Sequence, residues 1–165
     1  MTLDYGEAVQ VLRGIPLFAK LDPAKLKLLA FASEHLTFEN GETLFQVGAA
    51  ADSVYLIDEG EAEITVVAEE REIVISRLGK HDLFGEMAIF RRAPRSATVK
   101  ASGRLGVLKI EAPMFLEVVT ENPETARGVM HLLSDKIART TERFEELEGR
   151  VRMLESISEP PRASS

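Results

Sequence analysis

The sequence predicts an α+β fold in which short β-strands form a closed sandwich or barrel, with helices before it and a long helix after it. Helical signals come first, in residues 1–35, turn residues recur about every ten positions over residues 36–111, and a heptad pattern follows within residues 112–155. With 165 residues, 45% of them hydrophobic, the chain is long enough for one domain with a substantial core. The polar residues 156–165, which contain two adjacent prolines, are predicted to form a disordered tail.

The composition excludes several classes of function. The chain has no cysteine, so disulfides and thiolate metal sites are excluded. No apolar run approaches membrane-spanning length and the start, MTLDYGEAVQ, lacks the regions of a signal peptide, so we expect a cytoplasmic protein. The net charge of −7 argues against binding nucleic acid or an anionic membrane. The dense basic cluster is confined to Arg91, Arg92 and Arg95, where an anionic ligand would be met locally.

Two helices are expected in the N-terminal region. Residues 2–12 can form a short one. A clearer start lies at Asp22, an N-cap residue, followed by Pro23 at the first helical position. Leu26 and Leu29 then recur on one face, so we expect this second helix to pack on an apolar surface.

The middle of the chain reads as strands separated by turns. Turn signals recur at Asn40 with Gly41, Gly48, Glu59 with Gly60, Gly79 with Lys80, and Gly103. Alternation through SVYLIDEGEAEITVV predicts two antiparallel strands that reverse at Glu59 and Gly60, and residues 68–71 predict a hairpin loop. The last two strands are expected to join at Ser102 and Gly103.

The C-terminal region predicts a short helix over residues 112–119 and a long one that starts at Asn122 and Pro123. Apolar or small residues then alternate by three and four positions, at Met130, Leu133, Ile137, Thr140, Phe144, Leu147, Val151 and Leu154. We call these eight residues the seam. Its four heptads predict a homodimer through a parallel coiled coil over residues 130–154; the alternative is that the seam covers the core of the same molecule. Because eleven residues follow Leu154 in this sequence, we expect no helix-turn-helix after the long helix.

Residues 83–101, LFGEMAIFRRAPRSATVKA, carry the chemistry that points to a ligand. Gly85 lets the backbone approach a ligand closely, and the N–H groups of the short helix that follows form an anion-binding end. Arg95 adds a permanent charge with a fork of donors suited to phosphate. An ionised Glu86 can only accept hydrogen bonds, so its natural partner is a hydroxyl such as that of a ribose. The stretch predicts a site for a small anion that carries a hydroxyl.

This stretch resembles the phosphate-binding cassette of the cyclic nucleotide-binding domain family, and the upstream run GETLFQVGAAADSVYLIDEGEAEITV is similar to that family as well. The resemblance covers about residues 15–145. It implies a β jelly roll (double-stranded β-helix) with helices at both ends and a non-enzymatic sensor that binds a cyclic nucleotide without a metal. The ligand-binding residues that it implies are Phe84, Gly85, Glu86, Met87, Ala88, Arg95, Ser96, Ala97 and Val99.

The resemblance also implies a role for each key side chain. Glu86 would bind the ribose 2′-hydroxyl, and Arg95 with Ser96 would bind the cyclic phosphate. Ser96 favours cAMP as the ligand without excluding cGMP. Base contacts are expected from the long helix, where this chain departs from the small hydroxyl residues of the bacterial activators. The candidates are Thr140, Arg143 and Phe144, for which the alternative is a coiled-coil or surface role.

Two other classes of function compete with the sensor. In the first, Glu86 and Arg95 are a structural ion pair, and the chain is a ligand-free dimerisation or adaptor module whose coiled coil recruits an unknown effector protein. In the second, the chain is a metal enzyme of the cupin type. The histidines His35, His81 and His131 lack the spacing of metal ligands, and no serine or cysteine nucleophile has a plausible base beside it.

Overall fold

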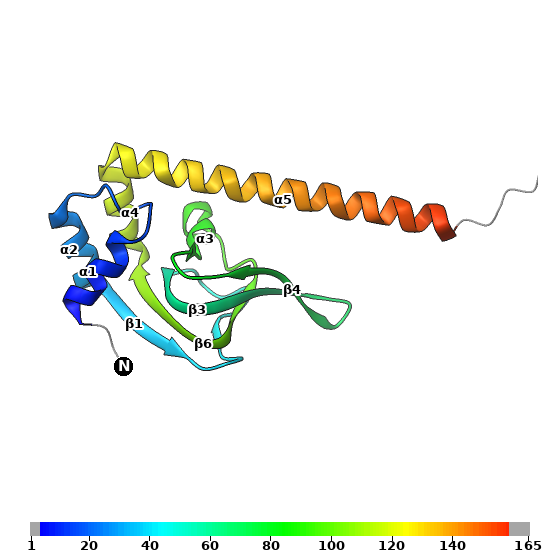
Figure 1. The fold of residues 1–165 in the computed structure, drawn as a ribbon, viewed down its shortest axis with the longest axis horizontal. Coiled ribbons are helices and arrows are strands. Elements are labelled where there is room, and N and C mark those ends of the chain that lie inside the picture. The colour runs from blue at the N-terminus through cyan, green and yellow to red at the C-terminus, as the bar shows by residue number, and fades with distance from the viewer. Residues whose placement is uncertain (1–3, 159–165) are drawn as a thin grey trace, which may run out of the picture. The chain divides into compact units, whose positions relative to one another are not determined.

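The computed structural model describes residues 4–158. The chain divides into two compact units between Arg127 and Gly128. The first unit holds the strands and most of the helices, and the second consists of the greater part of the long helix α5 (Pro123–Ser158), as Figure 1 shows.

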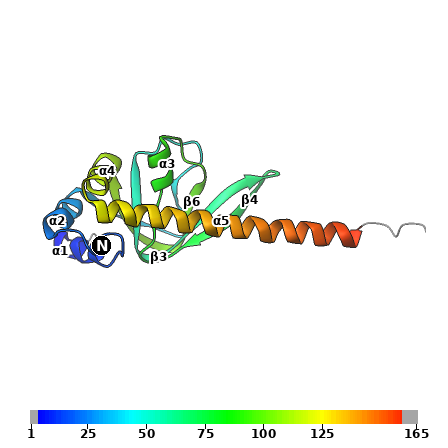
Figure 2. The ribbon, with the colours of Figure 1, turned by 90° about the horizontal axis from the view of Figure 1, so that it is seen from above.

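Three helices of the first unit gather at one end of the strands, away from the tip of the hairpin between β3 (Ser53–Ala68) and β4 (Arg71–Leu78), as Figures 1 and 2 show. They are α1 (Tyr5–Arg13), α2 (Pro23–Ala32) and α4 (Ala112–Glu121). Asp4 is the N-cap of α1, and its carboxylate accepts a 2.8 Å hydrogen bond from the N–H of Glu7. Asp22 is the N-cap of α2 as predicted, but its side chain accepts no capping hydrogen bond.

All the strand pairs in the described part of the chain are antiparallel, and they form one six-stranded sheet. The strands are β1 (Ser33–Phe38), β2 (Thr43–Phe45), β3 (Ser53–Ala68), β4 (Arg71–Leu78), β5 (Leu83–Phe84) and β6 (Thr98–Glu111). Their order is β1-β6-β3-β4, with β2 paired to β6 and β5 paired to β3. Strand β1 begins at Ser33, so the helical region ends slightly before residue 35, and His35 pairs with Leu108 in the sheet instead of ending a helix.

The two reversals predicted at Gly60 and Gly103 are wrong. Each glycine lies inside one long strand, Gly60 in β3 and Gly103 in β6. These two strands pair with each other along most of their length, and the register shifts on both sides of Glu59. The glycines adopt φ values of +86° and +77°. One type of β-bulge also has a glycine in this left-handed conformation, so the residues that signal a turn here bend a continuous pair of strands.

The hairpin loop predicted at residues 68–71 is confirmed. Strand β3 ends at Ala68 and β4 begins at Arg71, in register with it. The two residues between them, Glu69 and Glu70, have φ values of 51° and 65°. Positive φ at both central positions is what a two-residue hairpin of the favoured twist requires.

The sheet separates two apolar cores because successive side chains of a strand point to opposite faces. Tyr55 and Ile57 of β3 face the interior of the curled sheet, together with Leu105 and Val107 of β6. The alternate residues of both strands face the other way, and α2 and α4 pack against that side. In the second core the ring of Phe115 lies 6.5 Å from that of Phe18 and 5.8 Å from that of Phe90.

Helix α5 begins where the sequence predicts. The side-chain oxygen of Asn122 accepts hydrogen bonds from the N–H groups of Glu124 and Thr125, at 3.0 and 3.2 Å. The helix continues to Ser158, so residues 156–158 of the predicted tail are helical, and the rest of that tail lies outside the described residues. No helix in residues 4–158 is long and apolar enough to cross a membrane.

Candidate functional site

Gly85 connects strand β5 to the short helix α3 (Glu86–Arg91), which is the helix predicted within residues 83–101. It is the N-cap of α3, with φ at +85°. A Cβ atom at this position would lie 2.8 Å from Nη1 of Arg95, which is closer than carbon atoms approach such a group. Glycine is therefore required at this position for two reasons, the left-handed backbone and the close approach of the arginine.

Arg95 is anchored through its backbone by the loop that follows β2. The N–H of Gly48 donates to the carbonyl of Arg95 at 2.8 Å, and the N–H of Arg95 donates to the carbonyl of Ala49 at 2.9 Å. These two bonds fix the point from which the arginine side chain enters the unit.

The guanidinium of Arg95 is held by two further carbonyl oxygens. Nη1 donates to the carbonyl of Gly85 and Nη2 donates to the carbonyl of Ser53, both at 2.7 Å. The residue is 3% exposed, and its Nε has no hydrogen-bond partner in the described part of the chain. A buried N–H donor without a partner is costly, so this group is a candidate for a ligand that accepts hydrogen bonds.

Aromatic rings line the same region. The guanidinium carbon of Arg95 lies 4.1 Å from the ring centroid of Phe45 and 6.0 Å from that of Tyr55. The rings of Tyr55 and Phe84 are stacked at 5.3 Å, and Phe45 lies 5.7 Å from Tyr55 and 6.2 Å from Phe84. These three rings, which we call the aromatic trio, belong to β2, β3 and β5.

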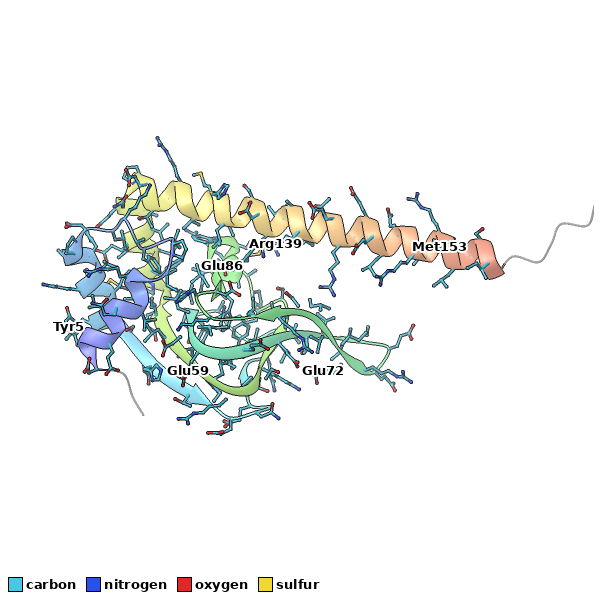
Figure 3. All side chains as sticks on the ribbon, in the orientation of Figure 1. Tyr5, Glu59, Glu72, Glu86, Arg139 and Met153 are labelled. Carbon is cyan, nitrogen blue, oxygen red and sulfur yellow. The ribbon has the colours of Figure 1, made fainter. Side chains whose placement is uncertain are left out.

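Glu86 is the second ionisable group of the site and is 1% exposed. It is the first residue of α3 (Figure 3), where a negative charge is favourable at the helix N-terminus. Burial lowers the pKa of Arg95 from its ordinary value, whereas Tyr55, Asp52 and Glu86 act to raise it. An arginine remains charged under these conditions. Glu86 is therefore close enough to Arg95 to act on its charge.

The other predicted ligand residues differ in their exposure. Phe84 and Val99 are buried and belong to the core of the curled sheet. Met87 and Ser96 are exposed, and Gly85, Ala88 and Ala97 are half-buried. A cavity of about 450 Å³ lies beside α3, and neither Glu86 nor Arg95 lines it. Its lining residues are Ala50, Ala51, Ala88, Ile89, Arg92, Ala93, Pro94, Ala112 and Leu116.

The sequence prediction of the site does not include three residues that contact the guanidinium of Arg95. Phe45 and Tyr55 contribute rings, and Ser53 contributes a carbonyl oxygen. The rings alternate with other apolar residues in their strands, which is the ordinary pattern of a core. Since any residue supplies a carbonyl, only the curvature of the sheet could have identified Ser53.

Thr140, Arg143 and Phe144, the candidate base contacts, lie on α5 in the second unit and stay predictions. The hydroxyl of Thr140 donates to the carbonyl of Lys136 at 2.8 Å, a bond within the helix. The side chain of Phe144 is 61% exposed. No three histidine or acidic residues gather as possible metal ligands within residues 4–158.

Comparison with known proteins identifies the family. The model of the cyclic nucleotide-binding domain matches residues 35–122. The chain is 36% identical over 109 residues to the cAMP-dependent protein kinase type II regulatory subunit of Drosophila melanogaster, covering 66% of this chain and 28% of that protein. It is 31% identical over 125 residues to a putative potassium channel protein of Rhodopseudomonas palustris, covering 76% of this chain and 30% of that protein. The chain spans less than a third of the length of these two curated relatives.

A solved structure gives the same result. The regulatory domain of Toxoplasma gondii PKA, co-crystallised with cAMP, matches with a TM-score of 0.63 and 25% identity over 69% of this chain and 44% of that one. The chain therefore belongs to the cyclic nucleotide-binding domain family, whose model describes a binding domain and not a catalytic one. The expected fold, a β jelly roll with N-terminal helices and a long C-terminal helix, is confirmed.

Proposed function

We propose that this chain is a non-enzymatic sensor that binds cAMP, in preference to cGMP, through Glu86 and Arg95. Glu86 accepts a hydrogen bond from the ribose 2′-hydroxyl, and Arg95 binds the cyclic phosphate with help from Ser96. The phosphate of a cyclic nucleotide is a singly charged diester, so one arginine and the N–H groups at the start of α3 balance it. Both side chains are almost fully covered in the free protein, so the nucleotide binds only when this region opens.

The observation that carries this proposal is the burial of two opposite charges, Glu86 at the start of α3 and Arg95 after its end. Burying two charges costs desolvation free energy, whereas apolar residues of similar size could fill the same space without that cost. A purely structural role therefore explains the buried pair poorly. A buried ionisable group whose pKa is perturbed, as that of Arg95 is, is typical of functional sites. The Nε of Arg95, buried and without a partner among the described residues, supplies a donor for a phosphate oxygen.

Isothermal titration of the purified chain with cAMP, cGMP and 2′-deoxy-cAMP tests the proposal. We expect cAMP to bind more tightly than cGMP. Loss of the 2′-hydroxyl is expected to weaken binding by about 1 to 3 kcal/mol, because the carboxylate of Glu86 loses its partner in a desolvated site. Glu86→Gln should weaken cAMP binding as well and reduce the difference between cAMP and its 2′-deoxy analogue.

The matched control is Glu111→Gln, which changes the same chemistry at an exposed residue at the end of β6. We expect it to bind cAMP like the unmodified chain. An absence of heat with all three nucleotides would contradict the sensor function. Equal affinity for cAMP and its 2′-deoxy analogue would instead contradict only the proposed contact between Glu86 and the ribose 2′-hydroxyl, and the sensor function would stand.

We also propose that two copies associate through α5 and that ligand binding is coupled to the position of this helix. What supports the association is the exposure of seven of the eight seam residues, all except Leu133. The β-branched Ile137 and Val151 occupy a positions of the heptad. Leucines occupy three of the d positions, at residues 133, 147 and 154. This arrangement favours a parallel two-stranded coiled coil.

Sedimentation of the full chain tests this association. We expect a dimer, and we expect Leu147→Asp combined with Leu154→Asp to give a monomer because two charges would be buried in the interface. Met153→Asp is the matched control, since Met153 is 67% exposed and lies on α5 outside the seam. If ligand and dimer are coupled, saturating cAMP changes the dimer dissociation constant, and dimerisation changes cAMP affinity by the same factor. A monomeric unmodified chain would contradict the association.

A further inference from the structure

Arg95 is held on two edges by carbonyl oxygens and on one face by an aromatic ring. The carbonyls belong to Gly85 and Ser53, and the ring belongs to Phe45, 4.1 Å from the guanidinium carbon. We propose that Phe45 is a positioning residue, which fixes the guanidinium plane before any ligand arrives. The consequence for nucleotide affinity rests on the proposed function, whereas the effect on Arg95 in the free protein does not.

The fold places Phe45 at this point by an irregularity in the sheet. Strand β2 is only three residues long, and its pairing with β6 shifts in register between Thr43 and Phe45, which then pairs with Val99. The ring also packs with Tyr55 and Phe84, at 5.7 and 6.2 Å. Its own position is therefore determined by the rest of the aromatic trio, and a ring fixed in this way leaves the guanidinium little freedom.

The energetics favour a specific role for the ring. Burial works against the charge of Arg95, as the lowered pKa of this group indicates. An aromatic face attracts a cation through its quadrupole, and the attraction is stronger where water is excluded. An aliphatic side chain of similar size would fill the space but would not offer this attraction. A guanidinium already oriented loses less rotational freedom when it binds a phosphate, so preorganisation raises affinity.

The first experiment uses the ligand-free chain and observes arginine Nε–H groups by ¹H–¹⁵N NMR. We expect Arg95 to give a slowly exchanging resonance displaced by the ring of Phe45, assigned by its loss in Arg95→Lys. In Phe45→Leu the resonance should move to the position of ordinary arginines, and in Phe45→Tyr it should stay displaced. Phe38→Leu, which alters an aromatic residue packed on the same core, should leave it unchanged. Circular dichroism of each variant establishes that it is folded.

The second experiment measures cAMP affinity by isothermal titration. Phe45→Leu should weaken binding by about 5- to 30-fold, and Phe45→Tyr should restore it. In a double-mutant cycle the effect of Phe45→Leu should largely disappear in the Arg95→Lys background, because a positioning residue acts only through its partner. Additive effects, or an unchanged Arg95 resonance in Phe45→Leu, would overturn the proposal. If the unmodified chain binds no nucleotide, the sensor function fails, and the NMR result alone decides the role of Phe45.

Discussion

Arg95→Ala is expected to weaken cAMP binding by about 2 to 5 kcal/mol, which is about 30- to 5,000-fold. The cyclic phosphate would lose the one buried cation that the described site offers it, and Arg95 would no longer offset the negative charge of Glu86 beside the ligand. Isothermal titration measures the affinity, and thermal unfolding in the presence and absence of cAMP gives an independent check. An unmodified chain should melt at a higher temperature with cAMP, and the variant should not.

The same substitution also destabilises the free protein, so binding and folding have to be separated. The carbonyls of Gly85 and Ser53 lose their donor, and Glu86 loses the charge that offsets it. Combining Arg95→Ala with Glu86→Gln also removes the negative charge of Glu86. We expect the double variant to regain part of the lost stability and none of the lost affinity. If Arg95→Ala binds cAMP as tightly as the unmodified chain, the role proposed for Arg95 fails. If neither chain binds cAMP, the ligand-free adaptor hypothesis becomes the better account.

The two charged side chains of the candidate site could be singled out from the sequence because they lie within one short stretch. Gly85 and Arg95 flank one short helix, α3, and Glu86 is its first residue. The surroundings of Arg95 could not be predicted in this way. Ser53 lies 42 positions upstream, and it reaches the guanidinium only because the sheet curls. Phe45 shows the same limit, since its contact with Arg95 depends on a register shift in β2.

The long helix could be predicted well because its signals are local. Asn122 and Pro123 mark its start, and the structure places α5 from Pro123 onward. Its end was placed a few residues early, at residue 155, because the apolar period stops before the helix does. Strand reversals depend on distant partners instead. Gly60 and Gly103 looked like turns, and the chain bends there without reversing because β3 and β6 stay paired on both sides.

Gly60→Ala is expected to lower the free energy of unfolding by about 2 to 5 kcal/mol. Two effects add at this position. Gly60 has φ at +86°, where a Cβ atom is strained, and that atom would lie 2.1 Å from the carbonyl oxygen of Arg104. The oxygen belongs to the backbone of β6, so it moves only if the paired strands separate. The urea midpoint, followed by circular dichroism, measures the loss, and the slope should stay constant if the unfolded state is unaffected.

Gly103→Ala is the matched control because it isolates the strain of the backbone. Gly103 has φ at +77°, and a Cβ atom there would meet nothing within 4 Å. We expect a loss of about 1 to 2 kcal/mol, clearly smaller than that of Gly60→Ala. Equal losses would mean that β3 and β6 do not approach closely at Gly60. A strand reversal at that glycine would then explain the data better, and the continuous pair of strands that carries Ser53 to Arg95 would have to be abandoned.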